Sequence, residues 1–319
     1  MTVRSDKEFN ITTSKRTYVY KTVQDCQIHA DVYRSPGEEQ RPAILWIHGG
    51  ALIFGDRSML PPEQVELYLT AGYTVVSIDY RLAPETKLQA ILEDVRDAYH
   101  WVSRQGPGLF NVDPDRLAVM GHSAGGYLTL MAGFSVHPRP KALVSFYGYG
   151  DILGDWYSRP DPHYNLEPAV APERARQGVG GPVIAGSPSA SLTEQRWLFY
   201  LYCRQQGLWP EEVTGTNPHT NPRVLEQFCP ERNVTQDYPP TLLLHGDQDT
   251  DVPFKLSVQM AEALKEQDVP HRLIMMKGLG HAFDILRDGL PEGEPLGLKH
   301  PKVAEAFDTV LAFLNNQMS

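Results

Sequence analysis

Several features are scarce in this chain of 319 residues, and each scarcity argues against a class of protein. Cysteine occurs only at Cys26, Cys203 and Cys229, an odd number without metal-ligand spacing. This pattern indicates reduced thiols rather than a disulfide framework. No stretch approaches the ~20 consecutive apolar residues that a membrane span requires. Residues 1–8 lack the apolar core of a secretion signal, so we expect a cytoplasmic protein.

An excess of positive charge is also missing. The 29 lysines and arginines are outnumbered by 39 aspartates and glutamates, which gives a net charge of −10. An acidic protein repels phosphate backbones, so nucleic acid is not an expected partner. Internal repeats and low-complexity tails are absent as well. A chain of this length and composition is typical of one large globular domain, with or without an insertion.

Short apolar runs alternate with amphipathic segments along most of the chain. The pattern predicts a β-hairpin over residues 18–33. It predicts further strands over 43–47, 74–78, 116–120, 142–146, 241–244 and 272–276. The helical pattern covers 63–71, 88–104, 124–134, 256–267 and 303–315. Continuous apolar strands between amphipathic helices predict an α/β fold, with a mostly parallel sheet covered on both faces.

Residues 148–236 break this alternation. They are dense in proline, glycine and aromatic residues, and no strand pattern stands out. We therefore expect a core formed by 1–147 and 237–319, with 148–236 inserted as a cap. The aromatic residues of this interval, among them Trp156 and Tyr157, either line a substrate pocket or pack the cap against the core.

The sequence Gly121-His122-Ser123-Ala124-Gly125 lies between a predicted strand and a predicted helix. At a sharp strand-to-helix turn a serine hydroxyl is pushed clear of the sheet. Glycines two residues on either side avoid clashes there. The pattern predicts a nucleophile at Ser123, and the alternative is an ordinary glycine-rich turn.

A serine nucleophile needs a base, a carboxylate to orient it, and donors for the oxyanion. His281 follows the last strand in a glycine loop and is the expected base. Asp247, Asp249 and Asp251 follow the preceding strand, and we choose Asp249 because the others can cap the turn or the next helix. The expected oxyanion donors are the backbone N–H groups of Gly50, Ala51 and Ala124.

Together these segments resemble the α/β-hydrolase esterases related to hormone-sensitive lipase. The resemblance rests on residues 48–51, 79–85, 93–95, 112–114 and 121–126. It implies an eight-stranded sheet, a Ser-His-Asp triad, and ester hydrolysis without a cofactor or metal. Ala51 stands where the family usually has a third glycine. The segment 246–253 is more similar to that of prolyl-peptidase and of feruloyl- or acetyl-esterase relatives, whose acid matches Asp249.

The sequence thus predicts a serine hydrolase that cleaves a carboxylic ester through an acyl-serine intermediate. A lactonase, an amidase or peptidase, and an acyltransferase use the same triad and are the alternatives within the enzyme class. A non-catalytic ligand-binding protein on the same scaffold is the alternative of another class. The expected partner is a small ester-type molecule, and an exposed edge strand or helix is compatible with a homodimer.

Overall fold

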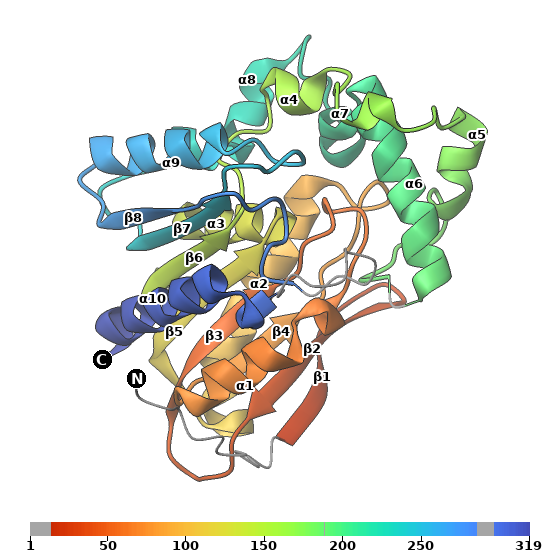
Figure 1. Cartoon of the computed structure of the whole chain (residues 1–319). Coiled ribbons are helices and arrows are strands. Elements are labelled where there is room, and N and C mark those ends of the chain that lie inside the picture. Colours follow the sequence, from red (N-terminus) through yellow and green to blue (C-terminus); the bar gives the residue numbers. More distant parts are fainter. Residues whose placement is uncertain (1–13, 188, 286–296) are drawn as a thin grey trace.

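A single eight-stranded sheet forms the centre of the computed structural model, which describes residues 14–187, 189–285 and 297–319 (Figure 1). The strands are β1 (Ser14–Val23), β2 (Cys26–Arg34), β3 (Arg41–Ile47), β4 (Thr74–Ile78), β5 (Val112–His122), β6 (Ala142–Phe146), β7 (Thr241–Gly246) and β8 (His271–Met276). Their spatial order is β1-β2-β4-β3-β5-β6-β7-β8. β2 pairs antiparallel with β1 and β4, and all other neighbours are parallel. The predicted α/β-hydrolase fold is confirmed.

Helices cover both faces of the sheet, which explains why its central strands are apolar throughout. One face packs against α2 (Leu88–Phe110), α3 (Ala124–Ser135) and α9 (Lys255–Glu266). The other packs against α1 (Pro62–Thr70) and α10 (Pro301–Met318) (Figure 1). Successive residues of a strand point to opposite faces. Leu45 of β3 accordingly lies in the first core, and Ile44 and Trp46 lie in the second.

The expected helix over 88–104 proved too short, since α2 continues to Phe110. The sequence pattern stops early because Gly106 and Pro107 are poor helix formers. The last turn is nevertheless held by contacts of Phe110, whose ring lies 5.8 Å from that of Tyr18 on β1 and 5.3 Å from that of Trp101, earlier in the same helix. The helix then ends at Asn111 in the left-handed conformation.

Between β6 and β7 the chain forms a layer of helices above the carboxyl ends of the strands (Figure 1). These helices are α4 (Asp155–Ser158), α5 (Pro172–Ala175), α6 (Ala190–Gln206), α7 (Trp209–Thr214) and α8 (Pro222–Leu225). The same segment contains the short 3-10 helices η2 (Tyr164–Leu166), η3 (Arg176–Gly178), η4 (Glu226–Phe228) and η5 (Pro230–Arg232). Two further 3-10 helices, η1 (Arg57–Met59) and η6 (Gly297–Lys299), lie outside it. We call the segment between β6 and β7 the cap.

Within the described part of the chain, no helix is both long and apolar enough to cross a membrane.

Buried arginine side chains connect the cap to the core. Arg196 of α6 is 1% exposed and donates to the carbonyl oxygens of Ile53 and Ala83. Its guanidinium also pairs with the Glu85 carboxylate at 2.8 Å. Trp209 of α7 donates from Nε1 to the carbonyl oxygen of Ala51 at 2.9 Å. The cap is therefore bonded directly to the loop that follows β3.

Candidate active site

Ser123 occupies a strained turn between β5 and α3. Its φ of 56° and ψ of −119° lie in a region that residues other than glycine rarely adopt. A Cβ on Gly121 would lie 2.3 Å from the carbonyl oxygen of Gly125, and one on Gly125 would lie 2.0 Å from that of Ile47. Neither position tolerates a side chain, for the steric reason expected from the sequence. The turn directs the serine side chain out of the sheet.

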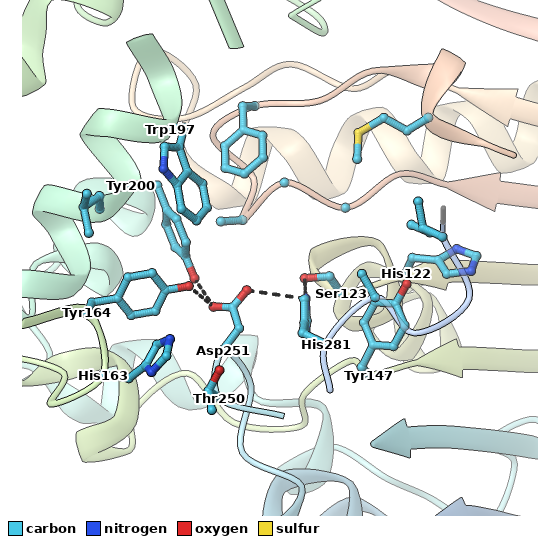
Figure 2. Close-up of a pocket in the computed structure, with 18 of the residues that line it drawn as sticks. His122, Ser123, Tyr147, His163, Tyr164, Trp197, Tyr200, Thr250, Asp251 and His281 are labelled. Carbon is cyan, nitrogen blue, oxygen red and sulfur yellow. Dashed lines mark hydrogen bonds and ion pairs between the residues drawn. The ribbon is translucent and has the colours of Figure 1, made fainter. Parts of the chain in front are cut away.

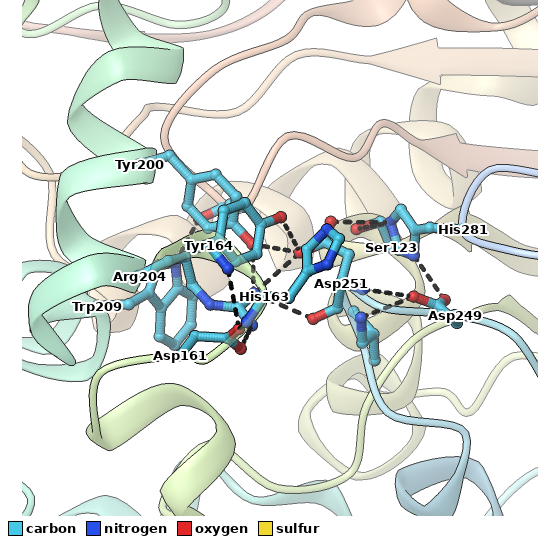
Figure 3. Close-up of polar contacts among 12 residues, drawn as sticks. Ser123, Asp161, His163, Tyr164, Tyr200, Arg204, Trp209, Asp249, Asp251 and His281 are labelled. Atoms are coloured by element: carbon cyan, nitrogen blue, oxygen red, sulfur yellow. Dashed lines mark hydrogen bonds and ion pairs between the residues drawn. The ribbon is translucent and has the colours of Figure 1, made fainter. Parts of the chain in front are cut away.

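A hydrogen-bonded chain joins Ser123, His281 and Asp249 (Figure 3). His281 Nε2 lies 3.0 Å from Ser123 Oγ, and its Nδ1 lies 2.7 Å from Asp249 Oδ2. The Asp249 carboxylate accepts only, so it selects the tautomer protonated at Nδ1. Nε2 is then left to accept the serine hydroxyl proton. Loops after β5, β7 and β8 supply these residues, because parallel strands place their carboxyl ends at the same edge.

Asp249 is the carboxylate that contacts His281 through Nδ1. Its Oδ1 accepts the backbone N–H groups of Asp251 and Val252 at 2.9 and 2.8 Å. Its Oδ2 also lies 3.1 Å from Nε2 of His245. Burial raises the pKa of a carboxyl, but the charges and hydrogen bonds of His281 and His245 outweigh it. They hold the pKa of Asp249 well below its usual range. Asp249 is thus ionised at neutral pH.

The other two aspartates of this loop have different partners. Asp247 accepts the backbone N–H of Gly278 at 2.6 Å, which links the loops after β7 and β8. Asp251 was expected to cap the next helix, and this was wrong. The residue before α9 is Phe254, and the Asp251 carboxylate points to the cap instead. Local sequence could not show this, because Asp251's partners Tyr164 and Tyr200 are remote in the chain.

The loop after β3 brings the expected oxyanion donors beside Ser123. Gly50, Ala51 and Leu52 have φ values of 98°, 54° and 63°, three left-handed residues in succession. A Cβ on Gly50 would lie 2.0 Å from the carbonyl oxygen of Phe54, so only glycine fits there. Gly50 and Ala51 line the same cavity as Ser123. Ala124 begins α3, where a backbone N–H has no acceptor within its own helix.

A cavity of about 670 Å³ opens above these groups, between the core and the cap (Figure 2). Its walls include Phe54 of the β3 loop and Tyr164, Trp197 and Tyr200 of the cap. Asp251 also lies on the wall, with Oδ2 3.4 Å from Nε2 of His281. Large apolar walls with a few polar groups are typical of small-molecule sites.

Trp156 and Tyr157, which were expected to contact substrate, are not among the described residues that line this cavity. Their rings stack at 3.8 Å, and Tyr157 stacks on Trp209 at 4.0 Å. Both belong to the apolar cluster on the α2 and α3 face of the sheet, so they pack the cap against the core, which was the other interpretation of the aromatic segment. The aromatic lining comes instead from Trp197 and Tyr200, three residues apart on one face of α6.

Sequence reasoning missed a buried network next to the nucleophile candidate. His122 accepts a hydrogen bond from Trp46 Nε1 at 2.9 Å through Nδ1, so its proton is on Nε2, 2.7 Å from Asp284 Oδ2. Tyr147 donates to the other oxygen of Asp284, and its ring lies 4.6 Å from that of His281. The network fixes the turn after β5 against the loop after β8.

Among the described residues, no group of three or more histidine, cysteine, aspartate and glutamate side chains is arranged to hold a metal ion. Cys203 and Cys229 are free and buried, and burial raises the pKa of the Cys203 and Cys229 thiols. These two cysteines are therefore poor nucleophiles.

A model of the alpha/beta hydrolase fold family matches residues 44–285. The chain belongs to this family. Among solved structures, this α/β hydrolase is similar to one of unknown function from Staphylococcus aureus, with 21% identity and a TM-score of 0.75 over 96% of this chain and 100% of the other. An alpha/beta hydrolase superfamily protein from Enterococcus faecalis gives 24% identity and a TM-score of 0.71 over 95% and 99%. A butyrate-bound esterase from Thermogutta terrifontis gives 20% identity and a TM-score of 0.64, over 95% of this chain and 94% of the other.

The similar curated proteins are much longer. A non-reducing polyketide synthase of Preussia isomera is 27% identical over 86% of this chain and 13% of its own length. A non-reducing polyketide synthase of Acremonium egyptiacum is 30% identical over 94% of this chain and 15% of its own length. The 5-methylorsellinic acid synthase of Aspergillus terreus is 28% identical over 87% of this chain and 12% of its own length. The chain thus spans between 12% and 15% of the length of these relatives.

Proposed function

We propose that this α/β hydrolase is a serine esterase that cleaves carboxylic esters through an acyl-Ser123 intermediate. The observation that carries the proposal is the hydrogen-bonded chain Ser123–His281–Asp249 at the cavity, with Ser123 in the strained turn. A nucleophile hydrogen-bonded to a base, and the base to an orienting carboxylate, is the arrangement that activates a hydroxyl.

In the proposed reaction, Ser123 Oγ attacks the ester carbonyl carbon while His281 Nε2 takes the hydroxyl proton. The backbone N–H groups of Gly50, Ala51 and Ala124 stabilise the oxyanion of the tetrahedral intermediate. His281 then gives its proton to the leaving alcohol as the C–O bond breaks. A water deprotonated by His281 attacks the acyl-serine and releases the acid, and Asp249 stabilises the imidazolium in both halves. The proposal needs no metal and no cofactor.

The cavity supports a substrate with an apolar or aryl group. Its wall contains the rings of Phe54, Trp197 and Tyr200, which favour flat apolar groups. The solved Thermogutta terrifontis esterase holds butyrate, a short acyl group. One of the curated relatives is named for an aromatic compound, 5-methylorsellinic acid. We therefore propose esters of small or medium acids, with an aryl group on one side. A cytoplasmic location and a homodimer stay predictions.

The test is hydrolysis of p-nitrophenyl esters from acetyl to dodecanoyl by the wild type and by Ser123→Ala. We expect the variant to lose about 10⁴–10⁶-fold in kcat with its fold intact. Ser103→Ala, in a serine of α2, is the matched control and should keep wild-type turnover. Turnover by Ser123→Ala at the wild-type rate overturns the mechanism.

A fluorophosphonate label separates the alternatives if no ester is hydrolysed. Labelling of Ser123 without ester turnover points to a lactone, an amide or peptide, or an acyl acceptor as the true substrate. No labelling and no turnover by folded protein point to a ligand-binding protein on a hydrolase scaffold.

A further inference from the structure

The two oxygens of the Asp251 carboxylate have different surroundings (Figures 2 and 3). Oδ1 accepts hydrogen bonds from the hydroxyls of Tyr164 at 2.7 Å and Tyr200 at 2.6 Å, and from Arg204 Nη1 at 2.9 Å. Oδ2 lies on the other side, 3.4 Å from His281 Nε2. With the imidazole proton on Nδ1, Nε2 has no proton to offer this oxygen. The carboxylate is thus oriented by the cap, with Oδ2 toward the reacting groups.

The positive charge of Arg204 is shared and turned away from the cavity. The guanidinium is 1% exposed and contacts the carboxylates of both Asp161 and Asp251. It lies against the rings of Tyr157 and Tyr164, 4.9 and 4.5 Å from their centroids. Two carboxylates face one guanidinium, so this cluster keeps a net negative charge.

Asp251 therefore gives the cavity an anionic wall. Burial raises the pKa of such a carboxyl, but the charge of His281 in its protonated form, the charge of Arg204 and the tyrosine hydroxyls hold the pKa of Asp251 below its ordinary value. Among the described lining residues, Asp251 and Glu167 are carboxylates and none is a lysine or arginine. The described part of the wall therefore offers a substrate carboxylate no lysine or arginine.

The position of Asp251 Oδ2 near His281 Nε2 relates it to the leaving group of a bound ester. His281 Nε2 must come within hydrogen-bond distance of the leaving oxygen in order to give up its proton. An oxygen 3.4 Å from Nε2 is therefore within reach of a substituent beside that leaving oxygen. A hydroxyl on the neighbouring carbon of the alcohol or phenol can donate to Oδ2, whereas a carboxylate at the same place is repelled.

We propose that Asp251 is a specificity-determining residue. It selects esters whose leaving group carries a hydroxyl beside the ester oxygen, such as a catechol or glycol monoester, and it rejects esters with a carboxylate there. This inference rests on the proposed esterase function and defines its substrate class.

The test compares three acetates that differ at one position: 2-hydroxyphenyl, 2-methoxyphenyl and 2-carboxyphenyl acetate. Each kcat/KM is divided by the rate of uncatalysed hydrolysis. We expect the wild type to prefer the hydroxyl over the methoxy compound by about tenfold or more, since hydrogen bonds to charged groups are the strong ones. Asp251→Asn should reduce this preference to about threefold or less and raise relative turnover of the carboxylate compound about tenfold.

Asparagine keeps an amide oxygen for the donors that Oδ1 now serves, so the orientation by the cap is retained. Glu167→Gln is the matched control, because it removes a different carboxylate from the same cavity wall. It should leave the hydroxyl-to-methoxy ratio unchanged. If Asp251→Asn lowers kcat/KM for all three substrates equally, the role of Asp251 is merely structural and the proposal is overturned. An equal increase in the relative turnover of the carboxylate compound by Glu167→Gln also overturns it.

Wild-type ratios decide the matter even if Asp251→Asn does not fold. Equal or better hydrolysis of the methoxy compound, or efficient hydrolysis of the carboxylate compound, overturns the assignment. Turnover of p-nitrophenyl acetate alongside such ratios leaves the esterase function standing and removes only the role of Asp251. Absence of all ester turnover and of fluorophosphonate labelling removes both.

Discussion

Neighbouring aspartates in one loop have distinct surroundings in this protein. The Asp249 carboxylate is buried and contacts the imidazoles of His245 and His281. Asp247 instead accepts a more exposed hydrogen bond from the backbone N–H of Gly278. Asp251 joins the cap. The difference arises from the turn, since Asp249 accepts the N–H groups of Asp251 and Val252 and is thereby held inward. Similar residues two positions apart thus make separate contacts through geometry alone.

Asp249→Asn tests the role of the buried carboxylate. We expect kcat to fall about 10³–10⁴-fold, because an amide can donate to Nδ1 and so favour the wrong imidazole tautomer. Asp247→Asn keeps an acceptor for Gly278 N–H and should stay within about threefold of the wild type. Steady-state ester hydrolysis, with thermal unfolding as the check on folding, measures both. A larger loss in Asp247→Asn would move the acid assignment.

At the scale of elements, α6 does more than line the cavity. Arg196 on this helix bonds to the carbonyl of Ile53, which lies three residues after Gly50. Trp209 of α7 bonds to the carbonyl of Ala51. The left-handed backbone of the β3 loop is thereby fixed from the cap side. Such fixation suits donors that must stay in place while charge develops on a substrate.

Breaking the Arg196–Glu85 pair should destabilise the protein strongly. Arg196→Met leaves the Glu85 carboxylate buried without its partner, and we expect a loss of about 3–5 kcal/mol in the free energy of unfolding. Adding Glu85→Met should recover part of the loss, because the uncompensated charge is removed. Denaturant unfolding measures both variants.

The matched control for this experiment is an exposed ion pair in the cap. Arg159 and Asp155 have side chains that are 63% and 82% exposed. Arg159→Met should cost less than about 1 kcal/mol, as exposed pairs contribute little. Equal effects of the buried and exposed arginine substitutions would contradict the role given to Arg196.

At the scale of the whole molecule, the site depends on the order of the strands. β3 neighbours β5, and β7 neighbours β8, so the loops after these four strands meet at one edge. Ser123 and His281 are 158 positions apart in sequence but 3.0 Å apart in space. The same compact fold buries His48, the first residue after β3, against the ring of Tyr80 at 4.2 Å.

The burial of His48 should appear as acid sensitivity of the whole protein. Burial lowers the pKa of His48 to about 4, against 6.5 for a free imidazole. The unfolded chain then binds a proton first, so stability falls as pH decreases from about 6.5 to about 4. Linkage gives a loss of about 2 kcal/mol by pH 5.

His48→Phe keeps a ring against Tyr80 and removes the ionisable group. Its free energy of unfolding should be lower at pH 7, because the imidazole hydrogen bond to the carbonyl of Gly49 is lost. The further loss between pH 7 and pH 5 should be smaller than in the wild type by about 2 kcal/mol. Urea unfolding at both pH values gives the change in the free energy of unfolding between pH 7 and pH 5 for each protein. Equal changes in the wild type and the variant would refute the assignment.

Much of the fold could be predicted because its signals are local. Alternating apolar strands and amphipathic helices located all eight strands, and the residues of β4 were predicted without error. The end of α2 was wrong because Phe110 is stabilised by Trp101 and Tyr18, which local propensity does not include. The cap gave no strand pattern, and its helices are mostly short.

By itself the sequence determined the strand-to-helix turn around Ser123, since glycines at 121 and 125 have a local steric cause. It also singled out His281 and Asp249, whose catalytic roles stay predictions. Only the tertiary structure decided that Trp156 and Tyr157 pack the cap against the core, and that Asp251 faces the cavity with Tyr164 and Tyr200 behind it. The physical reason is that a cavity wall is built from side chains remote in sequence, whose directions follow from packing rather than from local pattern.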